Sequence, residues 1–188
     1  EDIKEIVGDK GIVAGDAVTE NYAKTSTSEE IQKIMLFIIP VIVLILMIST
    51  SSWFEPFLFL FTVGISILIN TGTNIFLGEI SFITNATAAI LQLAVSMDYA
   101  IFLLHRFAEF RDEGLDVKEA MVNAMKKSYT SILSSGLTTI LGFLALTLMR
   151  FKIGPDLGTV LAKGIVFSLL SVMFLLPVLT IYTYKIID

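Results

Sequence analysis

Long apolar runs separated by short polar stretches dominate the chain from residue 31 onward. Runs of about 20 apolar residues are long enough to cross the hydrocarbon core of a bilayer as helices. The pattern predicts five such spans, at about 31–50, 57–77, 85–105, 129–149 and 164–184. Pro40 and Pro177 lie inside two of them, and membrane helices tolerate proline with a kink. We therefore expect an all-α membrane protein with a five-helix transmembrane bundle over residues 31–188.

The segment before the first span has a different character. Residues 1–30 are polar and acidic, and thirty residues cannot bury a core of their own. Ile3, Ile6 and Val7 suggest a short helix, and the glycines that bound residues 11–15 suggest a short strand. Ser26 or Thr27 is expected to cap the helix that becomes the first span. A disordered tail is the alternative interpretation of this segment.

The connections between the later spans predict their orientation. In residues 106–127, apolar side chains recur at helical spacing from Val117, and Asp116 with Glu119 resembles a capping box. We expect a short amphipathic helix that lies at the membrane interface. This connection and Lys185 together carry six Lys or Arg, which favours the cytoplasmic side for residues 106–127. Residues 150–163, which contain Gly154-Pro155, are expected to form a loop on the other side.

Composition agrees with a membrane protein and excludes several kinds of chemistry. The mean hydropathy is +0.82, and the net charge of −5 does not suit a nucleic-acid surface. There is no cysteine and a single histidine, His105, so thiolate and multi-histidine metal sites are excluded. The sequence contains no nucleophile–base–carboxylate set and no glycine-rich phosphate loop after a strand. We therefore predict a protein that is not an enzyme and has no cofactor or metal.

The third predicted span contains a carboxylate, Asp98, with Tyr99 beside it. An ionisable group in hydrocarbon costs at least ~2.5–3.5 kcal/mol, and it normally marks an ion or proton path. The alternative is a structural aspartate that caps or hydrogen-bonds a neighbouring helix.

Residues on two spans could surround this carboxylate. Asp98 and Ser135 each lie about 12 Å from the inner boundary, so they could face each other. Ser135 and Thr138 are then the best hydroxyl donors for Asp98. Phe102 lies between Asp98 and His105, and His105 either relays protons or is an interfacial residue without that role.

The Asp98 segment resembles the fourth-helix signature of the MMPL branch of the RND transporters. The resemblance covers roughly residues 31–188, but the glycines common two and four residues before the aspartate are replaced by Ser96 and Ala94. The residues that carry it are Asp98-Tyr99, Phe102-Leu103, Arg106, Glu109, Gly114, Glu119-Ala120, Ser134-Ser135-Gly136 and Leu176-Pro177.

The resemblance implies a proton-motive-force-driven exporter of lipids or other hydrophobic molecules in the cell membrane. In it, residues 1–30 end an extracytoplasmic porter domain, and the five spans correspond to the second to sixth helices of one half. Asp98 and Tyr99 form the proton relay, supported by Ser135, Thr138, Phe102 and His105. Because the chain begins without Met or a signal region, we expect it to be part of a larger protein.

Several partners follow from this resemblance, and two alternatives stay open. The expected partners are membrane lipid, protons, hydrophobic cargo, and a second transmembrane repeat or a second copy of the chain; no nucleic acid is expected. One alternative is a SecD/SecF-like protein-export motor. The other is a non-transporting, sterol-sensing-like module that binds lipid or serves as a scaffold.

Overall fold

The computed structural model describes residues 16–49, 54–78, 80–151 and 153–187, and every regular element in this part is helical. Five segments are long and apolar enough to cross a membrane: Glu29–Ile48, Glu55–Leu77, Phe82–Asp112, Val117–Leu148 and Ile153–Tyr184. The predicted all-α bundle with five spans is therefore confirmed. The elements are α2 (Asp16–Ser49), α3 (Glu55–Gly72), η1 (Thr73–Leu77), α4 (Phe82–Asp112), α5 (Val117–Ala145), η2 (Leu146–Leu148), α6 (Ile153–Leu170), η3 (Ser171–Leu175) and α7 (Leu176–Ile187).

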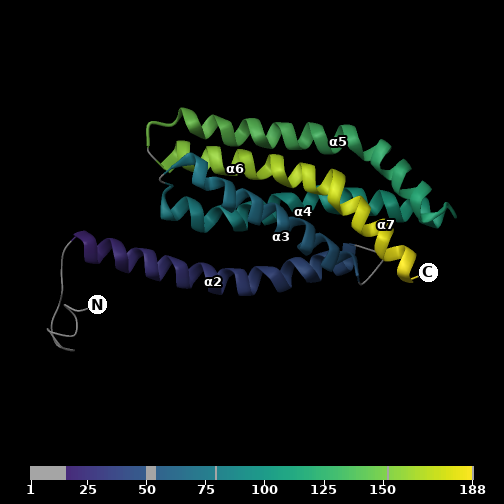
Figure 1. Ribbon diagram of the computed structural model, residues 1–188, viewed down its shortest axis with the longest axis horizontal. Helices are drawn as coiled ribbons and strands as arrows, with labels where there is room; N and C mark the ends of the chain where they lie inside the picture. Colours follow the sequence, from purple (N-terminus) through teal and green to yellow (C-terminus); the bar gives the residue numbers. More distant parts are fainter. Residues whose placement is uncertain (1–15, 50–53, 79, 152, 188) are drawn as a thin grey trace.

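Helices α4 and α6 form the centre of the bundle (Figure 1). Helix α5 packs along both of them, and α3 packs on both as well. Helix α2 packs on α3 and α4, where it buries Ile42 and Leu46, one turn apart. Other apolar side chains of α2, such as Leu36 and Phe37, are exposed, as expected where a helix borders lipid.

The first helix starts earlier than predicted. Helix α2 begins at Asp16, so the predicted helix start at Ser26 or Thr27 is wrong. Ala17, Glu20 and Ala23 are favourable helix formers, and they extend the helix through the Ser/Thr-rich stretch. The helix and the strand predicted before residue 16 lie outside the described residues.

The predicted loop over residues 150–163 is also wrong, because α6 begins at Ile153. Pro155 lies in its first turn, where the missing N–H has no helical partner to lose. The turn from α5 into α6 is tight: a Cβ atom on Gly158 would lie 2.5 Å from the carbonyl oxygen of Phe143. Glycines therefore allow α6 to start directly against the end of α5.

The connection between α4 and α5 is shorter than predicted. Helix α4 continues to Asp112, and Gly114 turns the chain at a φ of +87°, which favours glycine. Asp116 caps α5 and accepts a hydrogen bond from the Lys118 N–H at 3.4 Å. The expected amphipathic helix forms the first turns of α5. Its apolar side chains, including Val117 and Met121, are buried in the protein core and do not lie on the membrane surface.

The last span bends before its proline, as predicted. A π turn, η3, separates α6 from α7, and Pro177 is the second residue of α7. Figure 1 shows the change of direction between α6 and α7. Proline lacks an N–H and its ring crowds the carbonyl one turn earlier, so a regular α-helix cannot pass through it undisturbed. The wider π turn accommodates this loss and changes the direction of the helix.

A polar seam joins α3, α4 and α6, formed by the buried side chains of Ser66, Asn70, Gln92 and Ser168. The Gln92 Nε2 atom donates to Ser66 Oγ at 2.9 Å, to Ser168 Oγ at 3.0 Å and to the Gly164 carbonyl at 3.0 Å. Asn70 Nδ2 donates to Gln92 Oε1 at 2.9 Å. Because hydrocarbon offers no replacement partners, these bonds fix how the three helices sit against one another.

The seam predicts different outcomes for two glycines in the spans. A Cβ on Gly164 would lie 2.6 Å from Asn70 Nδ2 and 2.9 Å from Gln92 Oε1, whereas one on Gly142 would have open space. We expect Gly164→Ala to lower the free energy of unfolding by about 1–3 kcal/mol because the seam must shift. Gly142→Ala should be neutral or slightly stabilising. Thermal unfolding of both variants in detergent tests this, and equal midpoints would contradict the seam.

Candidate functional site

Helix α4 has two different faces at the middle of its length. Gln92, Ser96, Leu103 and Phe107 are buried toward the interior of the bundle. Asp98 follows Gln92 by six residues, which turns it well away from that face in a helix of 3.6 residues per turn. Its side chain is exposed on the surface of the chain. Asp98 therefore does not belong to the polar seam.

Asp98 opens into a hollow of about 210 Å³ between α4 and α5. The hollow brings together a carboxylate, a phenol and two aliphatic hydroxyls within a lining that is otherwise mostly apolar. Four of the residues predicted for the site are among those that line it. The lining residues are Asp98, Tyr99, Phe102, Ser131, Ile132 and Ser135.

Tyr99 connects α4 to α5. The residue is 3% exposed, and its Oη atom donates to Thr139 Oγ1 at 3.3 Å. Thr139 in turn donates to the Ser135 carbonyl at 3.0 Å. Thr138, which the sequence suggested for this side, is exposed, donates to the Ser134 carbonyl and lies outside the hollow. The spacing of four from Ser131 through Ser135 to Thr139 is the signal that could have identified Thr139.

The Asp98 carboxylate takes part in no hydrogen bond and no ion pair within the described part of the chain. Ser135 lines the same hollow without bonding to it. The alternative of an aspartate that caps or bonds a neighbouring helix therefore finds no support among these residues. A carboxylate that faces hydrocarbon is unfavourable, so this group needs water, a proton or another protein surface.

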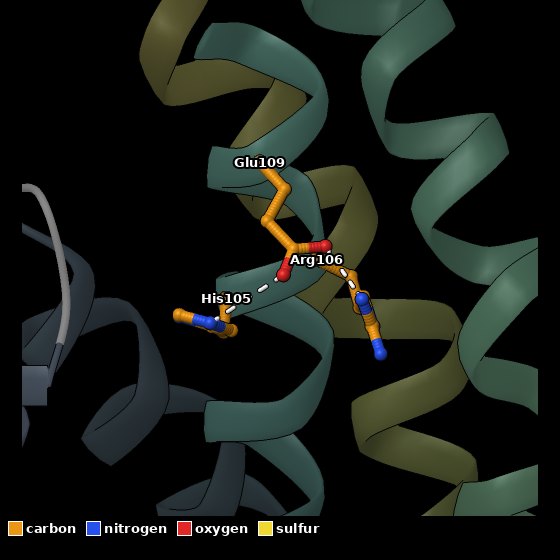
Figure 2. A network of polar contacts seen from close by, with 3 residues as sticks. All are labelled: His105, Arg106 and Glu109. Atoms are coloured by element: carbon orange, nitrogen blue, oxygen red, sulfur yellow. Dashed lines mark hydrogen bonds and ion pairs between the residues drawn. The ribbon is translucent and has the colours of Figure 1, made fainter. Parts of the chain in front are cut away.

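His105 and Arg106 meet at Glu109 (Figure 2). His105 Nε2 lies 3.6 Å from Glu109 Oε1, and Arg106 Nη1 donates to Glu109 Oε2 at 2.6 Å. The Arg106 guanidinium also lies over the Phe102 ring, 5.5 Å from its centroid, in a cation–π contact. Arg106, and not His105, therefore contacts a residue that lines the hollow, namely Phe102. His105 is exposed and is not among the lining residues.

Lys163 is a polar-site residue that the sequence pattern did not indicate, because residues 150–163 were expected to form a loop. Lys163 lies in α6, and its Nζ atom donates to the Asn70 carbonyl at 3.0 Å, to Thr73 Oγ1 at 3.0 Å and to Asn74 Oδ1 at 2.6 Å. The sequence shows that residues 70–74, at the end of the second span, are polar. Lys163, which binds them, lies about ninety residues further along the chain. No group of three or more His, Asp or Glu that could hold a metal occurs in the described ranges.

Comparison with known proteins identifies the family. The profile of the MMPL family matches residues 4–185. The chain belongs to the MMPL family. The resemblance drawn from the Asp98 segment is therefore confirmed, and the chain is a membrane protein of that family.

The MMPL relatives are longer proteins. A Methanocaldococcus jannaschii protein named "Putative membrane protein MJ1562" is 39% identical over 98 residues, which cover 51% of this chain and 25% of that protein. A Streptomyces coelicolor protein named "Putative membrane protein ActII-3" is 31% identical over 157 residues, 79% of this chain and 22% of that protein. A Mycobacterium tuberculosis protein named "Probable transport protein MmpL2" is 29% identical over 183 residues, 94% of this chain and 19% of that protein. No solved structure matches this MMPL chain.

The two neighbouring threonines of α5 give a matched test of the α4–α5 contact. Thr139→Val removes the acceptor of the buried Tyr99 hydroxyl, and we expect it to lower the free energy of unfolding by about 1 kcal/mol. Thr138→Val makes the same chemical change on an exposed side chain and should be nearly neutral. Equilibrium unfolding in detergent measures both. A larger loss for Thr138→Val would mean that α5 is rotated relative to this description.

Proposed function

We propose that this MMPL chain is one transmembrane repeat of an exporter in the cell membrane. The exporter is driven by the proton-motive force and moves lipids or other hydrophobic molecules. Family membership supports transport, since relatives carry names such as "Probable transport protein MmpL2" and "Probable transport protein MmpL12". The chain covers a quarter or less of its relatives' length, so transport is a property of the whole protein.

The unpaired Asp98 carboxylate is the observation that carries this proposal. It lies near the middle of α4, opens into the hollow between α4 and α5, and has no partner in the described part of the chain. Burial disfavours the charged form of a carboxyl group, and water favours it. A change in the hydration of the hollow would therefore load or release a proton at Asp98. Conversely, protonation would favour the more closely packed of two arrangements of α4 and α5.

The neighbours of Asp98 have complementary roles in this proposal. The Ser131 and Ser135 hydroxyls can donate to the charged carboxylate or accept from its protonated form. Tyr99, which bonds to Thr139, holds the wall of the hollow to α5. Phe102 provides an apolar wall. His105 pairs with Glu109 outside the hollow, so protons would reach Asp98 through the hollow and not through His105.

In this proposal, another protein surface covers the open side of the hollow. Transporter folds built from repeats place their ion sites near the midplane, at the interface between the repeats. We therefore propose that a second transmembrane repeat of the same protein covers the Asp98 side, or a second copy of this chain where no such repeat exists. Either cover would shield the carboxylate from lipid while leaving a path for protons.

Asp98→Asn tests proton coupling directly. It keeps the size of the side chain and removes its ability to release a proton, so transport driven by a pH gradient should fall to background. Asp112→Asn is the matched control, because it neutralises an exposed carboxylate at the end of the same helix and should leave transport unchanged. The measurement is cargo efflux from proteoliposomes that contain the whole transporter. Efflux at the wild-type rate from folded Asp98→Asn protein would refute the proposal.

Orientation in the membrane can be tested with single cysteines, since the sequence has none. We expect the α4–α5 turn to be cytoplasmic, so Asp112→Cys should resist an impermeant thiol reagent in intact cells. Arg150→Cys, in the α5–α6 turn, should react; this residue is exposed, whereas Asp156 accepts a hydrogen bond from the Ser81 N–H at 3.0 Å. Both cysteines should react after the cells are opened. The opposite pattern in intact cells would reverse the orientation.

A further inference from the structure

Oxygen atoms converge at the carboxyl end of α3, where the α-helix changes to a 3-10 turn; we term this point the break in α3. The regular helix ends at Gly72, and the chain continues as a 3-10 turn, Thr73–Leu77, to Gly78. The end of an α-helix leaves carbonyl groups without helical partners and carries partial negative charge. At this end the Asn70 carbonyl, Thr73 Oγ1 and Asn74 Oδ1 all face the same cation, the Lys163 ammonium of α6.

The Lys163 ammonium has one N–H donor for each of the three oxygen atoms. An ammonium group has three N–H donors and no acceptor, and Nζ has three acceptors at 2.6–3.0 Å. The single proton of the Thr73 hydroxyl is shared between the Ile69 carbonyl at 2.7 Å and the Asn70 carbonyl at 3.0 Å, so its lone pairs are available to Nζ. In the described part of the chain Lys163 forms no ion pair with a carboxylate. Among the described residues, the positive charge is thus held by neutral oxygens at the end of the second candidate span.

This arrangement has the chemistry of a monovalent-cation site. In transporters, carbonyls of unwound backbone and the ends of broken helices coordinate Na⁺ within the membrane. Divalent cations such as Ca²⁺ and Mg²⁺ draw on carboxylate ligands, which this set lacks. An ordinary lysine cap belongs to the last turn of its own helix. Here the lysine comes from a different helix that packs on α3.

We propose that the break in α3 is a monovalent-cation site whose permanent occupant is the Lys163 ammonium. The protein supplies its own cation at this point, so the site neither binds nor exchanges Na⁺ or K⁺ while Lys163 is present. The tethered charge holds the end of α3 to α6 next to Asn70, which belongs to the polar seam. This inference does not depend on the role of Asp98 in proton transport.

Removing the Lys163 ammonium should allow a free Na⁺ or K⁺ ion to bind at this site. Lys163→Ala leaves the oxygen set in place and creates space for Na⁺ or K⁺ with its remaining water. We expect the thermal midpoint of the purified variant to be lower than that of the wild type in choline chloride. Sodium or potassium chloride at the same ionic strength should raise the midpoint again, with saturation as the cation concentration increases. The wild-type midpoint should be the same in all three salts.

Two controls separate cation binding from a general salt effect. Leu169→Ala also weakens α6 at a buried position, but it removes no charge, so the alkali cations should give it no specific gain. Adding Asn74→Ala to Lys163→Ala removes one oxygen and should abolish the gain or shift it to higher concentration. Lys163→Ser, whose hydroxyl leaves an additional oxygen near the site, serves as a second variant and should show the same cation dependence.

Three results would overturn the proposal. If neither Lys163 variant gains stability from Na⁺ or K⁺ over choline, Lys163 is a simple helix cap. An equal gain in Leu169→Ala would also refute the site, because the effect would not depend on these oxygens. Failure of both Lys163 variants to fold even in high sodium or potassium chloride would count against it too, since an occupied site should support folding.

Discussion

The side-chain amide of Gln92 is the group on which the arrangement of the bundle depends. Its nitrogen bonds to α3 and α6 and its oxygen accepts from Asn70, so one side chain satisfies partners on two other helices. In a membrane no solvent can replace these bonds, and Gly164 lets the backbone come close enough to make them. Once Gln92 faces inward, the geometry of α4 directs Asp98 toward the α5 side.

The packing of α5 contrasts with that of the seam. Gly136 allows α5 to lie against Leu169 of α6, since a Cβ at that position would come within 2.5 Å of the leucine side chain. At the depth of Asp98, however, α5 presents the small side chains Ser131 and Ser135, and a hollow remains between the helices. The polar contact between α4 and α5 there is the Tyr99–Thr139 bond, which at 3.3 Å is long for two hydroxyls. The weak contact and the carboxylate therefore occur together, which is the arrangement that the proposed coupling of protonation to packing requires.

Local sequence patterns predicted the spans and the Asp98 neighbourhood, but not the partners that depend on tertiary packing. Apolar run length identified all five spans, and helical spacing brought Tyr99, Phe102 and Ser135 to Asp98. Thr139 was missed because depth alone does not fix the rotation of α5, so Thr138 was chosen one residue away. Lys163 was assigned to a loop because Gly154-Pro155 and a charge look like a break in sequence. Its three acceptors lie on α3 and η1, and no local pattern connects them to α6.

Lys163 and Asp98, two ionisable side chains within the candidate spans, have opposite surroundings. Lys163 has an acceptor for each of its protons, so its charge is satisfied by neutral dipoles at the end of α3. Asp98 has no partner among the described residues and does not pair with Lys163, although the two charges are opposite. A charged group whose hydrogen bonds are all made tends to keep its protonation state, because a change would leave its partners without a hydrogen bond. A carboxylate without such partners has no hydrogen bonds to lose among the described residues, and this difference is why the proposed function assigns proton exchange to Asp98 and not to Lys163.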